Sequence, residues 1–430
     1  MIKEEVVVYW FRRDLRLDDN CALYHALNSN YKVLPLFIFD ENILNDLPKN
    51  DARVNFIYQT LKQINNKLAK INASLYIKKG NVYSIWEIIF NEFIVKKVYF
   101  NKDYEPYARN RDEKISQICK QKNIECFSFK DQVIFEESEI IKSDNLPYTI
   151  YTPYKNKWLE KYKNYHTINF KSENYQNNFL KSNYVFPTLA FIGFNESNLN
   201  VMPINYRNIT NYEQIRDTPA FETSKTSTHL RFGTISVRKL VDYAKKTNEI
   251  YLNELIWREF FMQILYHFPK VIDENFKSKY NFIPWRNNEK EFQLWCEGET
   301  GYPIVDAGMK QLNQTGIMHN RVRMITASFL CKHLLIDWRW GEAYFAEKLL
   351  DYELSSNNGN WQWVSGTGCD TTPYFRVFNP ITQQQKFDPN FEYIKKWIPD
   401  FDNQKTIEIV AHKFARDRYL SVLKSRFYLK

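Results

Sequence analysis

Hydrophobic residues in the first 130 positions alternate between short continuous runs and a helical spacing. The runs are rich in Val, Ile, Phe and Tyr and cover 6–11, 33–40, 74–79 and 96–101. Segment 51–70 instead repeats apolar residues every three or four positions, as one face of a helix does. Near-continuous apolar strands separated by helices predict an α/β fold with a doubly wound parallel sheet. Such sheets bind ligands at the carboxyl ends of their strands, but WFRRDLRLDD after the first run lacks the GxGxxG dinucleotide pattern.

The pattern changes twice farther along the chain. Residues 148–170 are aromatic and basic without a clean period, and Asn- and Ser-rich sequence follows them. From about 201 onward the spacing is helical, as in segment 302–316, which opens near a proline and closes at a glycine. Segment 318–338 also carries its apolar residues on one helical face. We therefore predict an α/β domain at 1–130, an interdomain linker over the surface at 131–200, and an all-α domain at 201–430.

Composition narrows the class of protein. The 430 residues are 44% hydrophobic and 25% charged with a net charge of +9, which indicates a folded protein whose usual partner would be nucleic acid. Six cysteines form no CxxC pair and seven histidines are dispersed, so we expect neither disulfides nor a metal site. No signal-peptide pattern and no apolar run of membrane-spanning length occurs. We expect a cytoplasmic protein without membrane contact.

The hydroxyl-rich segment ETSKTSTHLRFG, at 222–233, is a candidate phosphate site. Its hydroxyls, backbone amides and single lysine stand at a predicted helix entrance, where a diphosphate can be bound. The same letters also fit a solvated Ser/Thr turn that caps a helix. The pattern alone leaves both interpretations open.

Two helical segments place polar side chains beside apolar ones. In NELIWREF, Glu254, Trp257 and Arg258 share a helix face. This face is either an ion pair beside a packed tryptophan, or a carboxylate and an indole that line a pocket while the arginine meets an anion. In HNRVRM, Asn320 and Met324 share a face and two arginines point elsewhere, which fits a polar cavity or an exposed surface.

Tryptophans are concentrated in the predicted helical half, where eight of the eleven lie. Tryptophan usually packs in a core. Indole can also be oxidised by one electron, which suits a light-absorbing redox cofactor. Trp361 and Trp363 stand in NNGNWQWVSGTG, whose Asn, Gly, Ser and Thr are typical of turns and hydrogen bonds rather than of a core segment.

Five stretches of the sequence carry a family resemblance when they are taken together. They are WFRRDLRLDDN, TSKTSTHLRFG, NELIWREF, GYPIVDAGMKQLNQTGIMHNRVRMITASFL and NNGNWQWVSGTGCDTTPYFRVFNP. They resemble the photolyase/cryptochrome family, and most closely the class I cyclobutane pyrimidine dimer photolyases. The resemblance implies an N-terminal α/β antenna domain and a C-terminal helical domain that holds FAD. It also implies light-driven repair of pyrimidine dimers in UV-damaged DNA by an electron from excited, reduced FAD.

The resemblance assigns FAD contacts to ten residues. The phosphate contacts are Tyr212, Thr223, Ser224, Lys225, Thr226 and Ser227; the acidic turn contributes Asp351 and Glu353; Arg323 pairs with Asp351; and Asn357 faces flavin N5. The family usually has Asp where this chain has Glu353. The phosphate interpretation of the hydroxyl-rich segment is strengthened accordingly.

The resemblance also assigns residues to electron transfer and to DNA binding. Electrons that reduce the flavin would pass along Trp285, Trp338 and Trp361. A flipped-out dimer would lie between Trp257 and Trp363, hydrogen-bond Glu254 and Asn320, and pack on Met324. The DNA phosphates would be bound by Arg216, Arg258, Arg321 and Arg376, without reading sequence.

Single positions favour a dimer photolyase, acting as a monomer, over other family members. Six-four photolyases carry a His pair where this chain has Asn320 and Met324. Plant cryptochromes have Asp and animal ones Cys at the position of Asn357, and the single-strand-preferring cryptochromes lack Trp363. A blue-light photoreceptor with the same flavin is the alternative, and a flavin-less DNA-binding module is the third hypothesis.

A second chromophore is expected in the N-terminal domain. The residues that match the deazaflavin-binding members are Phe37, Asp40, Arg53, Asp103 and Glu105. The folate-binding members have Asn and Glu where this chain has Tyr107 and Ala108. The sequence therefore favours a deazaflavin-type pocket and leaves FMN, a second FAD, folate or no antenna open.

Overall fold

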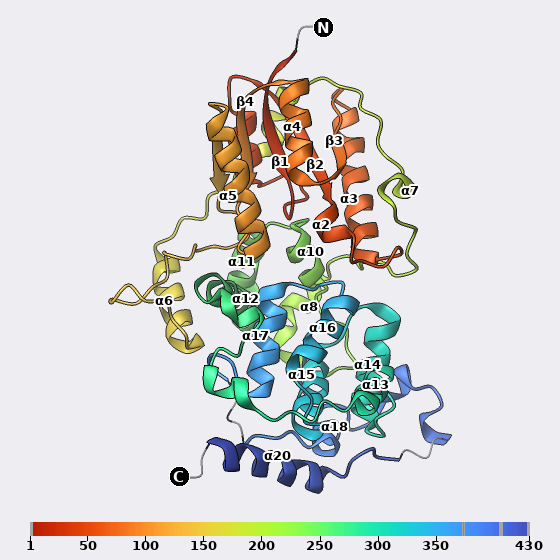
Figure 1. Ribbon diagram of the computed structural model, residues 1–430. Helices are drawn as coiled ribbons and strands as arrows, with labels where there is room; N and C mark the ends of the chain where they lie inside the picture. Colours follow the sequence, from red (N-terminus) through yellow and green to blue (C-terminus); the bar gives the residue numbers. More distant parts are fainter. Residues whose placement is uncertain (1–2, 372, 374, 404–406, 428–430) are drawn as a thin grey trace. The chain divides into compact units, whose positions relative to one another are not determined.

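The computed structural model describes residues 3–371, 373, 375–403 and 407–427, and the chain divides into two compact units (Figure 1). Unit 1 comprises Met1–Glu136, Lys161–Pro203 and Thr226–Tyr243; unit 2 comprises Glu137–Glu160, Ile204–Lys225 and Ala244–Lys430. The segment predicted as a linker thus contributes residues to both units. None of the described helices is long and apolar enough to cross a lipid bilayer.

Unit 1 is built on a parallel sheet that has five strands among the described residues, in the order β3-β2-β1-β4-β5. The strands are β1 (Glu5–Phe11), β2 (Lys32–Asp40), β3 (Tyr76–Gly80), β4 (Ile94–Asn101) and β5 (Glu125–Phe129). Four of them coincide with the apolar runs. The strand β5 was not predicted, because it lies at the edge of the sheet and its sequence, ECFSF, mixes polar and apolar residues instead of forming an apolar run. From β1 the chain adds β2 and β3 on one side of the sheet and then β4 and β5 on the other. The predicted doubly wound parallel sheet is therefore confirmed.

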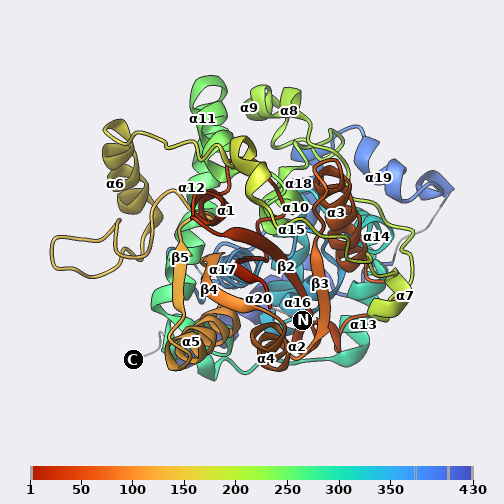
Figure 2. The same ribbon diagram turned by 90° about the horizontal axis from the view of Figure 1, so that it is seen from above.

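Helices cover both faces of this sheet (Figure 2). Alternate residues of β1 point to opposite faces, Val6, Val8 and Trp10 to one and Val7, Tyr9 and Phe11 to the other. The first face packs on α4 (Val82–Glu92) and α5 (Pro106–Gln121), and the second on α1 (Cys21–Leu27) and α3 (Ala52–Ala69). The other elements of unit 1 are α2 (Glu41–Leu44), η1 (Ser172–Asn178), α7 (Leu189–Ile192), α10 (Thr226–Phe232) and α11 (Val237–Thr247).

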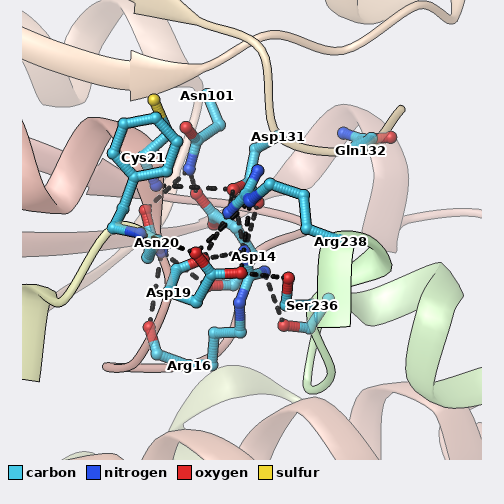
Figure 3. A network of polar contacts seen from close by, with 12 residues as sticks. Asp14, Arg16, Asp19, Asn20, Cys21, Asn101, Asp131, Gln132, Ser236 and Arg238 are labelled. Atoms are coloured by element: carbon cyan, nitrogen blue, oxygen red, sulfur yellow. Dashed lines mark hydrogen bonds and ion pairs between the residues drawn. The ribbon is translucent and has the colours of Figure 1, made fainter. Parts of the chain in front are cut away.

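The motif WFRRDLRLDDN folds into a buried polar network in unit 1 (Figure 3). Arg16 donates to both carboxylate oxygens of Asp131 at 2.7 and 2.8 Å, and Arg238 donates to Asp131 at 2.9 Å. Arg238 also lies 3.2 Å from the carboxylate of Asp19. Burial alone would raise the pKa of Asp131, but the two guanidinium groups lower it below its usual value. Because removing one partner of a buried ion pair costs about 3–5 kcal/mol, this network fastens the returning segment Thr226–Tyr243 to the sheet.

Unit 2 is built from helices. They are α6 (Tyr151–Lys163, whose last three residues fall in unit 1), α8 (Tyr206–Thr210), α9 (Tyr212–Ile215), α12 (Glu249–His267), η2 (Pro269–Ile272), η3 (Ser278–Phe282), α13 (Glu289–Glu297), α14 (Pro303–Thr315), α15 (Asn320–Ser328), η4 (Phe329–His333), α16 (Trp338–Lys348), α17 (Leu354–Ser365), α18 (Pro380–Phe387), α19 (Glu392–Trp397), η5 (Phe401–Asn403) and α20 (His412–Phe427). The predicted helix 302–316 is confirmed, since α14 ends where Gly316 takes a φ of 67°.

The prediction of one helical face along 318–338 is wrong in its second half. The helix α15 passes into a π-helical turn at Phe329–His333, and Leu335 then takes the left-handed conformation, with φ of 54°. A backbone hydrogen bond of 2.8 Å from the Arg286 N–H to the Leu335 carbonyl holds this turn. The next helix, α16, begins after this break at Trp338.

The interpretation of NNGNWQWVSGTG as turn-like is also wrong, because most of it is helix α17. The amide side chains of Asn358 and Gln362 each donate to the Val271 carbonyl at 2.9 Å. The Gln362 side chain also accepts from the backbone N–H of Phe276 at 2.8 Å. These amides bind a neighbouring segment instead of competing with their own helix, which removes the usual reason for Asn to favour turns.

Candidate functional site

A cavity in unit 2 gathers many of the residues with predicted roles. Its empty volume, which includes space open to solvent, is about 560 Å³. Apolar walls come from α16 and α17, among them Phe345 and Val364. The lining residues that the sequence had indicated are Asn320, Arg323, Met324, Asp351, Glu353, Asn357 and Trp361. Residues from two distant sequence segments therefore meet at one hollow.

An ion pair between Arg323 and Asp351 forms part of the cavity wall. Arg323 Nη2 lies 2.9 and 3.1 Å from the two carboxylate oxygens, and Arg323 Nε donates to the Met318 carbonyl at 2.8 Å. The arginine on α15 and the aspartate before α17 are therefore held in fixed orientations. The predicted pairing of these two residues is found in the structure.

Asn357 is held by a residue that the sequence did not indicate. Its Nδ2 donates to the carboxylate of Glu342 at 2.8 Å and to the Glu342 carbonyl at 3.1 Å. Burial raises the pKa of Glu342, and the hydrogen bond from Asn357 opposes this rise. No sequence signal connected the two, because they lie on different helices, α16 and α17, and only packing brings them together.

The second acidic residue of the turn, Glu353, binds Arg258 on α12. The two side chains are 3.1 Å apart and only 6% and 12% exposed, and the hydroxyl of Ser356 also donates to Glu353 at 3.3 Å. Glu353 is one methylene longer than the Asp usual in the family. The structure thus gives Arg258, assigned above to DNA, a carboxylate partner beside the cavity.

Glu254, one turn before Arg258 on α12, pairs with Arg216 at 3.1 Å. Burial raises the pKa of Glu254, while Arg216 and a hydrogen bond from Tyr212 act in the opposite direction. The Arg216 guanidinium also lies over the Tyr212 ring at 5.5 Å. Glu254 is therefore a partly buried carboxylate that is paired with Arg216 and has Arg321 as a second basic neighbour. It does not belong to the cavity lining described above.

Trp257 on the same helix is covered by a residue from the region expected to be a surface linker. Tyr151 stacks on it with ring centroids 3.6 Å apart and planes 8° from parallel. The sequence signal existed: Tyr151, Tyr154 and Trp158 follow the i, i+3, i+7 spacing of one helix face. Basic residues between them obscured this stripe.

The four remaining predicted tryptophans belong to one core cluster or pack against it. Trp361 and Trp338 are buried, while Trp285 and Trp363 are partly buried against the same cluster. Trp361 meets Phe345 edge-on at 5.0 Å. The Trp338 indole N–H donates to Asn275 at 2.8 Å.

The last two predicted DNA contacts differ in their surroundings. Arg321 donates to Asp217 at 3.1 Å and lies over the Phe387 ring at 4.4 Å, so a phosphate would compete with a carboxylate there. Arg376 is exposed, and its backbone carbonyl accepts from Lys332 at 2.9 Å. Asp217 is a further neighbour that sequence spacing could not indicate.

The hydroxyl-rich segment crosses the boundary between the units, which falls after Lys225. On the unit 2 side, Ser224 is buried 3.2 Å from the Tyr251 hydroxyl, Thr223 is half-buried and Lys225 has a φ of 59°. On the unit 1 side, α10 begins at Thr226, so the predicted helix entrance is confirmed, and Ser227 is exposed.

The predicted antenna residues lie in unit 1, and their charged groups all have partners. Asp40 accepts from the Tyr107 hydroxyl at 2.6 Å, and Arg53 pairs with Asp51. Asp103 and Glu105 bind Arg13 at 3.2 and 3.0 Å, and Glu105 also binds Arg231. Burial opposes ionisation of Asp103, yet Arg13 and its basic neighbours lower the pKa to about 2. Phe37 is buried on β2.

Comparison with known proteins identifies relatives of both halves of the chain. Residues 7–172 match the family model described as DNA photolyase, and residues 251–425 match the FAD binding domain of DNA photolyase. The Vibrio cholerae deoxyribodipyrimidine photo-lyase is 34% identical over 91% of this chain and 89% of its own length.

Solved structures agree with these matches. The archaeal photolyase from Sulfolobus tokodaii, crystallised with two FAD molecules, is 34% identical with a TM-score of 0.83, covering 98% of this chain and all of that one. A Synechocystis cryptochrome shares the fold at 24% identity, with a TM-score of 0.85 over 98% of this chain and 100% of that one. With both domain models matched in order and one-third identity over nine-tenths of its length, the chain belongs to the DNA photolyase family and carries that family's FAD-binding domain.

Proposed function

We propose that this protein is a light-driven enzyme that cleaves cyclobutane pyrimidine dimers in DNA. The observation that carries the proposal is the single cavity lined by the flavin-type residues Arg323, Asp351 and Asn357 together with the dimer-binding residues Asn320 and Met324. Relatives with the name deoxyribodipyrimidine photo-lyase support the same conclusion.

The cavity residues fit an isoalloxazine ring. Arg323 offers N–H donors and Asp351 an acceptor, in a pair that is already oriented, and these suit the carbonyl and N–H groups along a flavin's pyrimidine edge. Asn357 uses its Nδ2 on Glu342, which leaves Oδ1 as an acceptor for the N–H that a reduced flavin carries at N5. Trp361 and Phe345 supply apolar walls. The residue set therefore favours the reduced form of the cofactor.

The remaining residues bind the damaged strand. Bound, reduced FAD supplies the photoexcited electron that opens the cyclobutane ring, and the electron is afterwards returned. Asn320 donates hydrogen bonds to the flipped-out bases, and Met324 packs beneath them. Trp257 and Trp363 hold the dimer by stacking, which works for any base because every base has a π-face.

Phosphate binding is proposed for Arg216, Arg321 and Arg376. Arg376 is exposed, whereas Arg216 and Arg321 would exchange a carboxylate for a phosphate when DNA binds. Arg258 is placed differently, since its buried pair with Glu353 holds the cavity wall. The expected salt dependence of DNA binding is thus that of about three phosphate contacts.

The electron path for flavin reduction is proposed to run from Trp285 through Trp338 to Trp361, which lines the cavity. The three indoles share one core cluster, and their exposure rises from the buried pair to the partly exposed Trp285. An antenna chromophore is proposed for unit 1 at Phe37, Asp40, Arg53, Asp103 and Glu105, with the deazaflavin type favoured. Extraction of the purified protein and mass spectrometry of the released chromophores tests its identity.

The activity is tested by incubating the purified protein with an oligonucleotide that contains one thymine dimer, in blue light and in darkness. Restoration of intact thymines in light only is expected. The variant Trp363→Ala is expected to lose most of this repair, whereas Trp340→Ala, which truncates a tryptophan packed on the same cluster, keeps it. Equal dimer loss in light and darkness contradicts the proposal. A flavoprotein that responds to light without repairing DNA would be the photoreceptor alternative.

A further inference from the structure

Helix α6 packs against α12 through three buried aromatic residues. Tyr151, Tyr154 and Trp158 occupy one face of α6 and are 6%, 1% and 1% exposed. The Tyr154 hydroxyl and the Trp158 indole N–H both donate to the buried carboxylate of Glu259 on α12, at 3.2 and 2.7 Å. This contact fixes the position of α6 against α12.

Tyr151 is the member of this face that meets Trp257. The two rings are nearly parallel, with centroids 3.6 Å apart, whereas the other neighbours of Trp257 pack less closely, Phe260 edge-on at 5.6 Å and Phe261 tilted at 5.4 Å. Only Tyr151 therefore lies flat and in close contact against the indole among the described ring contacts. A flat contact of this kind fixes the plane of the indole as well as its position.

Tyr151 is itself held at both ends. Its hydroxyl donates to the Asn253 carbonyl at 2.8 Å, one turn before Trp257 on α12. Its backbone N–H donates to the carboxylate of Asp370 at 2.9 Å. The hydroxyl contact limits sliding of the ring along the indole, and the backbone contact holds the first residue of α6 in place.

We propose that Tyr151 is a positioning residue for damaged DNA, which fixes the plane of the Trp257 indole before a dimer binds. The inference rests on the proposed function, in which Trp257 is an aromatic wall for the extruded bases. A side chain that is ordered in advance does not lose rotational freedom on binding, so its contact with the ligand is stronger. Tyr151 acts through Trp257 and needs no contact with DNA.

The expected effect is on recognition of the lesion and not on the electrostatic part of binding. Replacing Tyr151 by Met fills a similar volume without a plane, and Tyr151→Ile is the second non-planar variant. Either variant is expected to bind dimer-containing DNA about 3- to 10-fold more weakly, the range that loss of one aromatic stack implies. Affinity for undamaged DNA and the salt dependence of binding stay unchanged, since no phosphate contact is altered.

The test measures affinity in darkness for two oligonucleotides that differ only in one thymine dimer. Tyr151→Phe keeps the stack and is expected to keep the preference for damaged DNA within about 2-fold. Tyr154→Met is the matched control, because Tyr154 lies on the same face of α6 and contacts Glu259 and Phe260 instead of Trp257. In this variant Trp158 still donates to Glu259 at 2.7 Å and holds α6 against α12. Thermal unfolding and the FAD absorption spectrum of each variant show whether the fold and the cofactor are retained.

Three outcomes distinguish the positioning role of Tyr151 from the proposed function. Weaker discrimination in both non-planar variants, with Tyr151→Phe and Tyr154→Met near wild type, supports the positioning role. Unchanged discrimination in folded Tyr151→Met or Tyr151→Ile overturns it and leaves the proposed function standing. A wild-type protein that does not distinguish damaged from undamaged DNA overturns both.

Discussion

Replacing Asn357 by Asp tests how the cavity wall is held. In the wild type the Asn357 amide donates to the Glu342 carboxylate at 2.8 Å. The change Asn357→Asp removes that donor and places two carboxylates in contact at a partly buried position. The substitution keeps the size and shape of the side chain, so its effect comes from charge and hydrogen bonding alone.

The magnitude follows from comparing two costs. Two ionised carboxylates 2.8 Å apart repel by about 6 kcal/mol at an effective dielectric constant of 20. Binding one proton at pH 7 costs about 1.36 kcal/mol for each pH unit above the ordinary glutamate pKa of 4.5, or about 3.4 kcal/mol. The smaller cost prevails, so the variant binds a proton and loses about 3 kcal/mol of unfolding free energy at pH 7.

The sign of the pH dependence follows from the same reasoning. The shared proton has a higher pKa in the folded protein than in the unfolded chain. The deficit of the variant is therefore small near pH 4.5, where the unfolded chain is also protonated, and it grows as pH rises toward the raised pKa. At pH 5.5 the expected deficit is about 1.4 kcal/mol.

Urea unfolding followed by tryptophan fluorescence, at several pH values between 5 and 8, measures this deficit. The double variant Glu342→Gln with Asn357→Asp is the matched control, because the new glutamine can donate to the new carboxylate. It is expected to recover most of the lost stability and to show little pH dependence. A deficit for Asn357→Asp that is below 1 kcal/mol at pH 7 and does not change with pH would show that the two carboxyl groups do not share a proton.

Substitutions at three further positions test other contacts. Gly341→Ala would bring a Cβ within 2.2 Å of the Trp361 ring. A loss of about 1–3 kcal/mol in unfolding free energy and slower light-driven flavin reduction are therefore expected. Unchanged stability would contradict this packing. Burial lowers the pKa of His319 to about 4, so protonation of the unfolded chain destabilises the protein as pH falls from 6.5 toward 4. The variant His319→Asn cannot bind this proton and keeps an acceptor for the cap of α15. Its unfolding free energy should therefore change less with pH in this range. Glu353→Gln removes the charge that pairs with buried Arg258 and is expected to weaken FAD retention on dialysis. Glu353→Asp keeps the charge on a side chain one methylene shorter and should weaken retention less. Equal retention by all three proteins would argue against the pair.

The sequence was most informative where one element can be recognised from its own residues. Apolar runs gave four strands of the sheet, and a proline and a glycine bounded α14, because strand burial and helix termination are local properties. Two predictions failed for a tertiary reason: the amides of Asn358 and Gln362 bind a neighbouring segment, and the π-turn before Leu335 depends on its surroundings.

The functional residues divide in the same way. The family resemblance of the long motifs had indicated the arginine, acidic and asparagine residues that line the cavity. Glu342 beside Asn357, and Tyr151 beneath Trp257, came only from the structure. The spacing of residues within one helix can be read from the sequence, because the α-helix has a fixed period. Which helix packs beside it depends on the burial of all their side chains together, and only the tertiary structure decides that.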